Sequence, residues 1–278
     1  MERIGQMKNK FKKNPYLYLG LSLGAILAAL AILVPVLSTQ SYSDQNSAIQ
    51  NLGSSMTHLF GTDKFGRDIF VRVFFGTRIS LIVGLTSALI CGLFGIFYGA
   101  VAGFAGGMVD ICMMRLADVI DAIPSLLYVI LITLTLGANV MGIVAGICIS
   151  GWIELARIVR GEVMRLKQKE FCMAAGLYGA KPLYLLRKHI LPNAAGVIIV
   201  NLTFFIPKAI FTEAFLSFMG VGIAAPIASL GTLIQDARSQ MRLYPYQMIY
   251  PILILCLLII SFQMIGMGLE KKMDVQNE

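Results

Sequence analysis

Long runs without a charged residue constrain this chain more than any other feature. One run covers residues 16–37 with 22 positions, and another covers 243–269 with 27 positions. A helix needs about 20 apolar residues to cross the roughly 30 Å hydrocarbon core of a bilayer. Backbone groups in lipid are satisfied only within helices or a closed barrel, and long uninterrupted apolar runs favour helices. The chain is therefore predicted to be an all-α membrane protein.

The composition supports a membrane protein and excludes a nucleic-acid-binding one. Hydrophobic residues make up 57% of the 278 positions and charged residues only 14%, whereas charged residues make up about a quarter of a soluble domain. The net charge of +8 is explained by basic residues that accumulate in cytoplasmic loops. The five cysteines show neither a disulfide pattern nor metal-ligand spacing, so we interpret them as small buried hydrophobic residues.

About six transmembrane helices are predicted from the uncharged runs. The first, 16–37, is longer than a signal-peptide core and is expected to be retained. The second is 79–102. Between Asp121 and Glu154 lie 32 uncharged residues, too few for two crossings of about 20 residues each. The third helix is therefore expected to begin near 115–121, and the fourth to end near Arg157.

The fifth helix is expected to run from Asn193 towards Gly222, bent or broken at Pro207, which lacks an amide donor. The sixth is 243–269. The resulting division of the chain is a cytoplasmic N-terminus at 1–15, a first transmembrane helix at 16–37, an outer loop at 38–78, a core of five transmembrane helices at 79–269 that includes a cytoplasmic segment at 161–192 and an outer segment at 221–244, and a cytoplasmic C-terminal segment at 270–278.

The distribution of basic residues predicts the orientation. With both termini inside, the cytoplasmic segments hold 16 of the 23 Lys and Arg residues and the outer side holds seven, Lys208 among them. Because short cytoplasmic loops carry an excess of Lys and Arg, we predict a multi-pass protein of the cell membrane with both termini in the cytoplasm.

The cytoplasmic segment 161–192 is predicted to form two short helices separated by a break. Apolar residues recur at mostly helical spacing in its first half. Gly179 is a natural helix stop, and Pro182 suits the first turn of the next helix, where a missing amide is tolerated. The pattern predicts a rigid helix-turn-helix that projects from the membrane and needs a partner.

This segment is similar to the ATPase-coupling loop of binding-protein-dependent ABC importer permeases. The pattern of that family is Glu-Ala-Ala, three residues, Gly, and a later Leu-Pro. The residues that the resemblance assigns to coupling are Met173, Ala174, Ala175, Gly179, Ala180, Lys181, Pro182, Leu191 and Pro192. Met173 stands where the family has Glu, so the salt bridge that this Glu would make is not expected. The remaining contact with the ATPase is docking of the helix in a groove. The alternative is an amphipathic helix that lies on the lipid surface.

The resemblance covers nearly the whole chain and narrows to the dipeptide, oligopeptide and nickel permease branch. Five further matches follow in chain order, at 61–68 (GTDKFGRD), 106–118, 123–125, 156–163 and 213–220. The resemblance implies a type I ABC importer permease fold. One such match would carry little weight, but five in order identify the branch.

The motif at 61–68 contributes the outer candidates Gly61, Asp63, Gly66, Arg67 and Asp68. It lacks the Gly-Lys-Ser or Gly-Lys-Thr ending of a phosphate loop. The two aspartates are candidates for a cation site, but a turn held by Asp-to-backbone hydrogen bonds is favoured. We hypothesise that this loop contacts an external substrate-binding protein or stabilises the outer gate.

Other ionisable residues lie in or next to the predicted spans. Asp110, Arg115, Asp118, Glu154 and Arg157 are placed at the inner rim, with Asp121 beside them, and mutual pairing is favoured over a substrate role. Glu213 lies within the fifth span. It is expected either to face the translocation path or to lie near the outer interface with water or Lys208 as its partner.

The resemblance implies a permease subunit that forms half of a pore with a second, related permease. Two cytoplasmic ATP-binding subunits would bind ATP and Mg and drive the movement, and an external substrate-binding protein would deliver the cargo. No cofactor is expected in this chain, which is not predicted to be an enzyme. Peptides are the expected cargo, with nickel or a metal-chelator complex as the alternative within the branch. An ion-coupled secondary transporter is the alternative from another class.

Overall fold

Helices account for every regular element in the part of the chain that the computed structural model describes, residues 14–277. The elements are α2 (Pro15–Leu37), η1 (Ser47–Ile49), α3 (Ile69–Ala105), α4 (Gly107–Asp121), α5 (Ser125–Leu136), α6 (Val140–Ser150), α7 (Trp152–Lys167), α8 (Glu170–Leu177), α9 (Pro182–Leu185), η2 (Leu186–Ile190), α10 (Leu191–Phe218), α11 (Leu230–Arg238) and α12 (Tyr246–Asn277). The all-α prediction is confirmed. The predicted N-terminal segment lies outside the described residues except for its last two positions.

Five helical segments are long and apolar enough to cross a membrane: α2, α3, α6 with α7, α9 through α10, and α12. A sixth span results if the pair α4 and α5, which meet at an angle of 72°, is counted as one broken crossing. This agrees with the predicted number of about six. The protein is therefore a multi-pass membrane protein.

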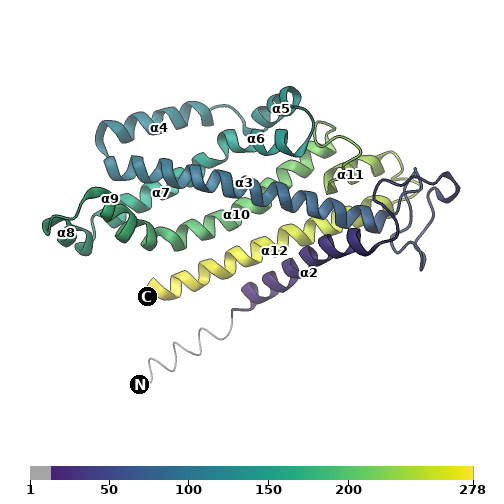
Figure 1. Ribbon diagram of the computed structural model, residues 1–278, viewed down its shortest axis with the longest axis horizontal. Helices are drawn as coiled ribbons and strands as arrows, with labels where there is room; N and C mark the ends of the chain where they lie inside the picture. Colours follow the sequence, from purple (N-terminus) through teal and green to yellow (C-terminus); the bar gives the residue numbers. More distant parts are fainter. Residues whose placement is uncertain (1–13, 278) are drawn as a thin grey trace, which may run out of the picture.

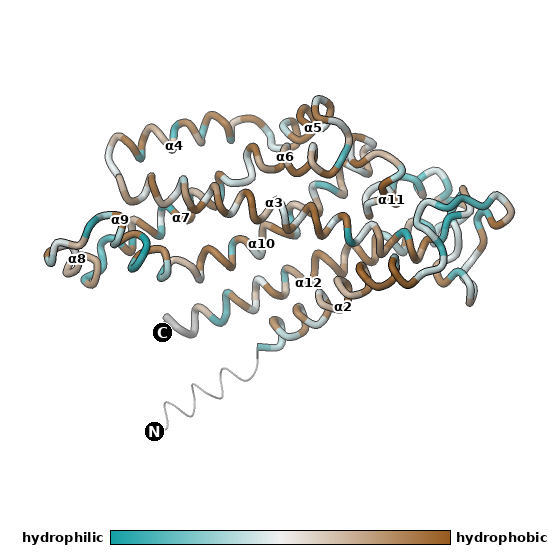
Figure 2. Tube along the Cα trace, viewed as in Figure 1, coloured by the Kyte–Doolittle hydropathy of each residue, from teal (hydrophilic) through white to brown (hydrophobic). Residues whose placement is uncertain are grey.

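The long helices lie side by side in an elongated bundle (Figure 1). Helix α3 packs on α7, α10 and α2, and α12 packs on α2 and α10. The projection α8–α9 and the end of α12 lie at one end of the bundle, and the polar loop that precedes α3 lies at the other (Figure 1). Hydrophilic residues gather at these two ends, whereas the helices between them are mainly hydrophobic (Figure 2).

The contact between α3 and α7 is made by glycines. Gly95, Gly99 and Gly103 follow one another at intervals of four on α3, so they share one face of the helix. A Cβ atom on Gly95 would lie 2.8 Å from the Trp152 carbonyl oxygen, and one on Gly103 would lie 2.6 Å from the Arg160 carbonyl oxygen. Small residues at this spacing let two helix backbones approach closely, which drives helix association in membranes.

The predicted boundary between the outer loop and the second span was wrong by ten residues. Helix α3 begins at Ile69 rather than at Ile79, because Asp68 caps it: its side chain accepts a hydrogen bond from the Val71 amide. The loop that was predicted to be outer therefore covers 38–68. Arg72, which was assigned to that loop, is instead buried in the first turns of the helix.

The chain reverses direction between α3 and α4 at two glycines. Gly106 and Gly107 have φ values of +69° and +54°, a left-handed conformation that side chains other than glycine rarely adopt. Helix α4 therefore begins at Gly107, earlier than the predicted start of the third span near 115–121. The predicted single third helix is also broken, because the residue before Pro124 is disfavoured in a helix and Pro124 has no amide to donate.

The remaining helix ends also differ from the predictions. The fourth span continues to Lys167 instead of ending near Arg157, so the first residues of 161–192 belong to α7. Helix α10 is not broken at Pro207, which lies inside it; a transmembrane helix tolerates proline when its freed backbone groups are satisfied locally. Helix α12 begins at Tyr246 and continues to Asn277, so most of 270–278 is helical, since Glu and Lys are good helix formers.

Candidate functional site

The projection at one end of the bundle is formed by α8, a tight turn and α9, and is here called the knuckle (170–185). Gly179 has a φ of +81° and ends the helical hydrogen-bond pattern, with the Ala180 amide donating to the Ala175 carbonyl at 3.1 Å. Glycine adopts this left-handed conformation without strain, and asparagine and aspartate adopt it at lower energy than other residues. Pro182 then starts α9. The predicted pair of short helices around a break is confirmed.

One face of the knuckle is anchored to the bundle. Cys172 of α8 is buried in a cluster with Leu166 of α7, Ile190 of η2 and Ala194 of α10. Burial raises the pKa of the Cys172 thiol above its ordinary value. A single buried contact thus connects the knuckle to two membrane-spanning helices at once.

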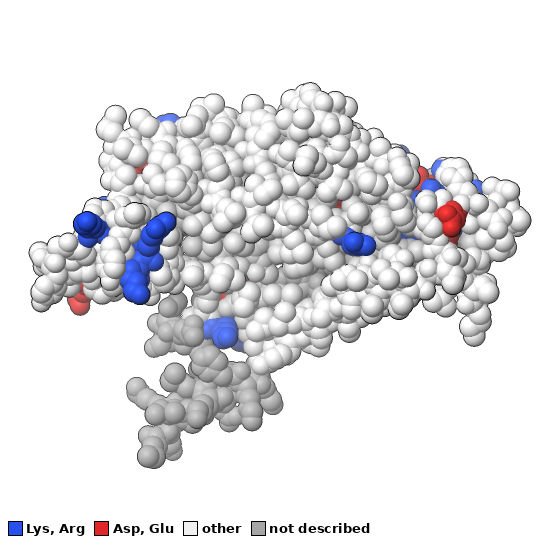
Figure 3. Space-filling model, viewed as in Figure 1, with Lys and Arg blue, Asp and Glu red and all other residues white. Residues whose placement is uncertain are grey.

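The opposite face of the knuckle is apolar and exposed. Leu177 and Tyr178 are 90% and 93% exposed, and Met173, Leu183 and Tyr184 are also exposed. Basic side chains gather over the same end of the molecule (Figure 3). A contiguous exposed apolar patch bordered by polar residues marks a surface for interaction with a protein or a membrane.

The other predicted coupling residues are divided between the knuckle and α10. Ala174, Lys181 and Pro182 are exposed on the knuckle, and Ala175 and Ala180 are partly buried there. Leu191 and Pro192 are separate from this tip, because they form the first turn of α10. Their assignment to coupling stays a prediction.

At the other end of the bundle, Asp63 organises the turn that precedes α3. One of its carboxylate oxygens, Oδ1, accepts hydrogen bonds from the amides of Phe65 at 2.8 Å and Arg67 at 3.0 Å. The other, Oδ2, accepts from Arg67 Nε at 2.7 Å. Gly66 lies in the same turn and donates its amide to the Asp63 carbonyl at 2.9 Å. The predicted turn held by Asp-to-backbone hydrogen bonds is confirmed.

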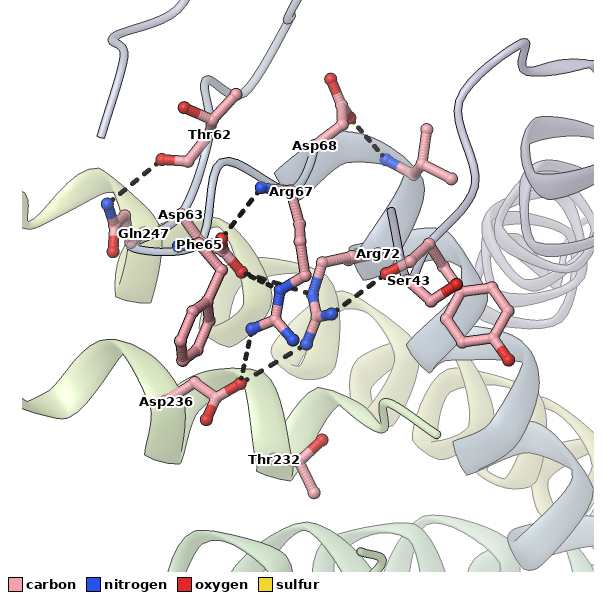
Figure 4. A network of polar contacts seen from close by, with 12 residues as sticks. Ser43, Thr62, Asp63, Phe65, Arg67, Asp68, Arg72, Thr232, Asp236 and Gln247 are labelled. Atoms are coloured by element: carbon pink, nitrogen blue, oxygen red, sulfur yellow. Dashed lines mark hydrogen bonds and ion pairs between the residues drawn. The ribbon is translucent and has the colours of Figure 1, made fainter. Parts of the chain in front are cut away.

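Two arginines join this turn to α11, as Figure 4 shows. Arg67 Nη2 and Arg72 Nη2 lie 3.1 Å and 3.4 Å from the same oxygen of Asp236, Oδ2. Arg72 also donates to the Tyr42 carbonyl at 3.0 Å. Both guanidinium groups are buried, so their charges depend on Asp63 and Asp236 for compensation.

Asp68 has a separate, structural task. Its Oδ1 accepts the Val71 amide at 2.9 Å as the cap of α3, and its Oδ2 lies 2.8 Å from Nδ1 of His58. Gly61, the first residue of the motif, donates its amide to the His58 carbonyl at 2.9 Å. The carboxylate oxygens of Asp63 and Asp68 are therefore all occupied by groups of the protein.

Replacing Asp63 with alanine is expected to lower the free energy of unfolding by about 3 kcal/mol, since it leaves buried arginine donors and two turn amides without an acceptor. The measurement is the thermal unfolding midpoint of the purified protein in detergent, together with the rate of proteolysis within 38–68. The matched control is Asp44→Ala in the same loop, whose exposed carboxylate accepts, among residues 14–277, only the Ser41 amide, at 3.3 Å. Equal midpoints for the two variants would contradict the assigned role of Asp63.

The acidic residues of α4 pair with α7. Arg157 donates to Asp118 at 2.9 Å and to Asp121 at 2.7 Å, and Arg115 lies 3.6 Å from Asp118. Asp110 accepts two hydrogen bonds from Arg160. Mutual pairing was predicted for these residues and is confirmed, although most of the pairs run between helices instead of along one.

Glu154 does not belong to that group. Its Oε2 lies 2.7 Å from Nζ of Lys208 in α10. Lys208 was assigned to the outer side and Glu154 to the inner rim, and both assignments cannot hold for side chains in direct contact. Since Glu154 is the fifteenth residue of the span Val140–Lys167, the pair lies near the middle of that span.

Glu213 is buried completely, with 0% exposure. Its carboxylate accepts hydrogen bonds from the hydroxyls of Ser80 at 2.9 Å and Ser217 at 2.8 Å. Neither predicted environment is correct, because Glu213 faces neither a path nor Lys208. The reason is that Ser217, one turn later on the same helix face, and Ser80 on α3 enclose it.

Two residues that take part in these contacts were missed. Asp236 and His58 carry no local pattern that distinguishes them. Their partners lie 169 and 10 positions away in the sequence. The spacing of Gly95, Gly99 and Gly103, in contrast, is a visible signal of close helix packing.

A multi-span helical bundle with an exposed apolar knuckle at one end and an anchored polar loop at the other defines a multi-pass membrane protein that offers a surface to a partner. Comparison with protein families matches residues 95–275 to the binding-protein-dependent transport system inner membrane component. The chain belongs to this family.

Individual relatives extend the match to almost the whole chain. The oligopeptide transport system permease protein OppC of Bacillus subtilis is 42% identical over 265 residues, which is 95% of this chain and 87% of that protein. The dipeptide transport system permease protein DppC of the same organism is 41% identical, over 95% of this chain and 83% of that protein. The corresponding OppC of Escherichia coli K12 is 37% identical, over 96% and 89% respectively. The resemblance stated from the sequence motifs is confirmed, and it favours the importer permease over an ion-coupled transporter.

Proposed function

We propose that this chain is a permease subunit of an ATP-driven importer that translocates dipeptides or oligopeptides across the cell membrane. The observation that carries the proposal is the similarity to peptide permease proteins over 95% of the chain. The subunit would form half of the pore with a second, related permease. An external substrate-binding protein would deliver the peptide.

The knuckle is proposed as the contact with two ATP-binding subunits, which bind the ATP and Mg that drive the cycle. Support comes from its exposed apolar surface, which fits a groove on a partner protein. In this arrangement the knuckle and both termini lie in the cytoplasm. The excess of basic residues on that side supports this orientation.

The loop anchored by Asp63, Arg67 and Asp236 would then face outwards and meet the substrate-binding protein. Its rigidity supports this role, because a preorganised surface loses less entropy on binding. The residues of the loop and of α11 that the two arginines hold together would form one face.

The test is reconstitution of the complete transporter in proteoliposomes, with the products of neighbouring genes. We expect ATP-dependent uptake of a labelled dipeptide or oligopeptide that requires the binding protein and both ATPases. A preparation that contains ADP in place of ATP is the control. Uptake that proceeds without ATP, or uptake of nickel or a metal-chelator complex in place of peptide, would overturn the proposal.

A further inference from the structure

A groove on the surface of the bundle holds four charged side chains in the middle of the apolar helices. It has a volume of about 350 Å³, and its polar lining consists of Asp121, Ser125, Ser150, Glu154, Arg157, Lys208 and Thr212. We call it the charged groove. Its volume lies within the range of about 300–1,000 Å³ that is typical of small-molecule sites.

The central pair of this groove is exposed to an unusual degree. The side chains of Glu154 and Lys208 are 67% and 66% exposed although they contact each other at 2.7 Å. Charged side chains within a membrane span are unfavourable in contact with lipid and face a water-filled path or other protein. The charged groove therefore faces away from the hydrocarbon in the working protein.

The groove resembles the wall of a water-filled translocation path more closely than it resembles a buried interface between subunits. The centres of protein interfaces are depleted of charged residues, and burial of an ion pair without further hydrogen bonds carries a large desolvation penalty. Here the surface is concave, the two acids and two bases balance in charge, and the hydroxyl of Ser150 lies beside them.

The ion pair between Glu154 and Lys208 is also weak enough for each side chain to bind a ligand in place of the other. An exposed Lys–Glu pair contributes only about 0–1 kcal/mol, so a competing charged ligand separates it with little loss. The Asp110–Arg160 pair differs, because Arg160 binds both oxygens of a buried aspartate. Glu154 and Lys208 thus offer one carboxylate and one ammonium group to a ligand that carries both opposite charges.

We propose that the charged groove is a binding site in the translocation path for the charged ends of a peptide. Glu154 binds the α-ammonium group and Lys208 binds the α-carboxylate, so a dipeptide engages both at once and a longer peptide engages them in turn. Ser150 donates a hydrogen bond to the peptide backbone, and the Thr212 hydroxyl, which itself donates to the Lys208 carbonyl at 2.8 Å, accepts one from a peptide amide. This inference rests on the proposed function and specifies which atoms of the peptide the permease recognises.

The test compares end-modified peptides in the reconstituted transporter at saturating loaded binding protein. A free dipeptide, its N-acetyl derivative and its C-terminal amide serve as probes, after the affinity of the binding protein for each has been measured separately. Glu154→Gln is expected to lower the transport rate of the free dipeptide about tenfold, because one charged hydrogen bond is lost. It should leave the rate of the N-acetyl derivative near that of the unmodified protein. Lys208→Gln should produce the same pattern with the amide.

Glu270→Gln and Lys271→Gln are matched controls, since they remove the same charges at exposed positions of α12. Equal losses for all three probes would show that Glu154 and Lys208 act only on structure, and would overturn the inference. Loss of the second permease from the purified Glu154→Gln complex would identify the groove as a subunit interface, which also overturns it. If the unmodified complex transports no peptide, the proposed function itself fails.

Discussion

Replacing Gly99 with leucine is expected to prevent stable packing of α3 against α7. A Cβ atom at this position would overlap the Ala156 carbonyl oxygen and lie 2.9 Å from Cβ of Val159. The atom that the new side chain would meet is a backbone carbonyl oxygen, which cannot move aside as a flexible side chain can. Overpacking of this kind costs about 3 kcal/mol, and for a helix pair at the centre of the bundle we expect little folded protein.

The measurement is the yield of monodisperse protein in detergent and its thermal unfolding midpoint. Gly161→Leu is the matched control, because Gly161 lies on α7 itself and nothing lies within 4 Å of a Cβ atom built there. That variant should fold as well as the unmodified protein or better, since leucine is the stronger helix former. Similar behaviour of the two variants would contradict close backbone packing between α3 and α7.

Replacing Gly179 with aspartate is expected to weaken ATPase docking and peptide uptake together while the permease still folds. Aspartate adopts a positive φ at lower energy than most residues, and a Cβ atom at Gly179 meets nothing within 4 Å in this chain. The aspartate therefore has little effect on folding, but its carboxylate would be buried at the contact with the proposed ATPase. An unpaired charge at such a contact weakens docking at least about tenfold.

The measurements are co-purification of the ATP-binding subunits and ATP-dependent peptide uptake in proteoliposomes. Gly179→Asn is the matched control, since asparagine has nearly the same shape and the same tolerance of positive φ without the charge. It should retain most of the docking and uptake. Normal uptake by the aspartate variant would remove the knuckle from the mechanism.

The helical class and the number of spans were predictable because they depend on local composition. An uncharged run long enough to cross the bilayer has few alternatives to a helix. The ends of the helices were less predictable, because they depend on single residues with specific tasks. Asp68 starts α3 ten residues early through its side-chain cap, and Pro124 divides the third span.

In the candidate sites, too, features that depend on local sequence were predictable and features that depend on distant residues were not. The knuckle was predictable because Gly179 and Pro182 act on their own backbone. The ion pairs were not, because Glu154 and Lys208 are 54 positions apart and Arg67 and Asp236 are 169 apart. A single sequence contains no information about which of several distant charges meet in space.

The anchoring of the knuckle by Cys172 has a mechanical consequence. Its cluster joins α8 to α7 and α10, and these two helices carry Glu154 and Lys208. A force applied to the exposed tip would therefore act on both helices, and a difference between their movements would change the separation of the two opposite charges. In the proposed transporter, movement of the knuckle and binding of the peptide would then be coupled.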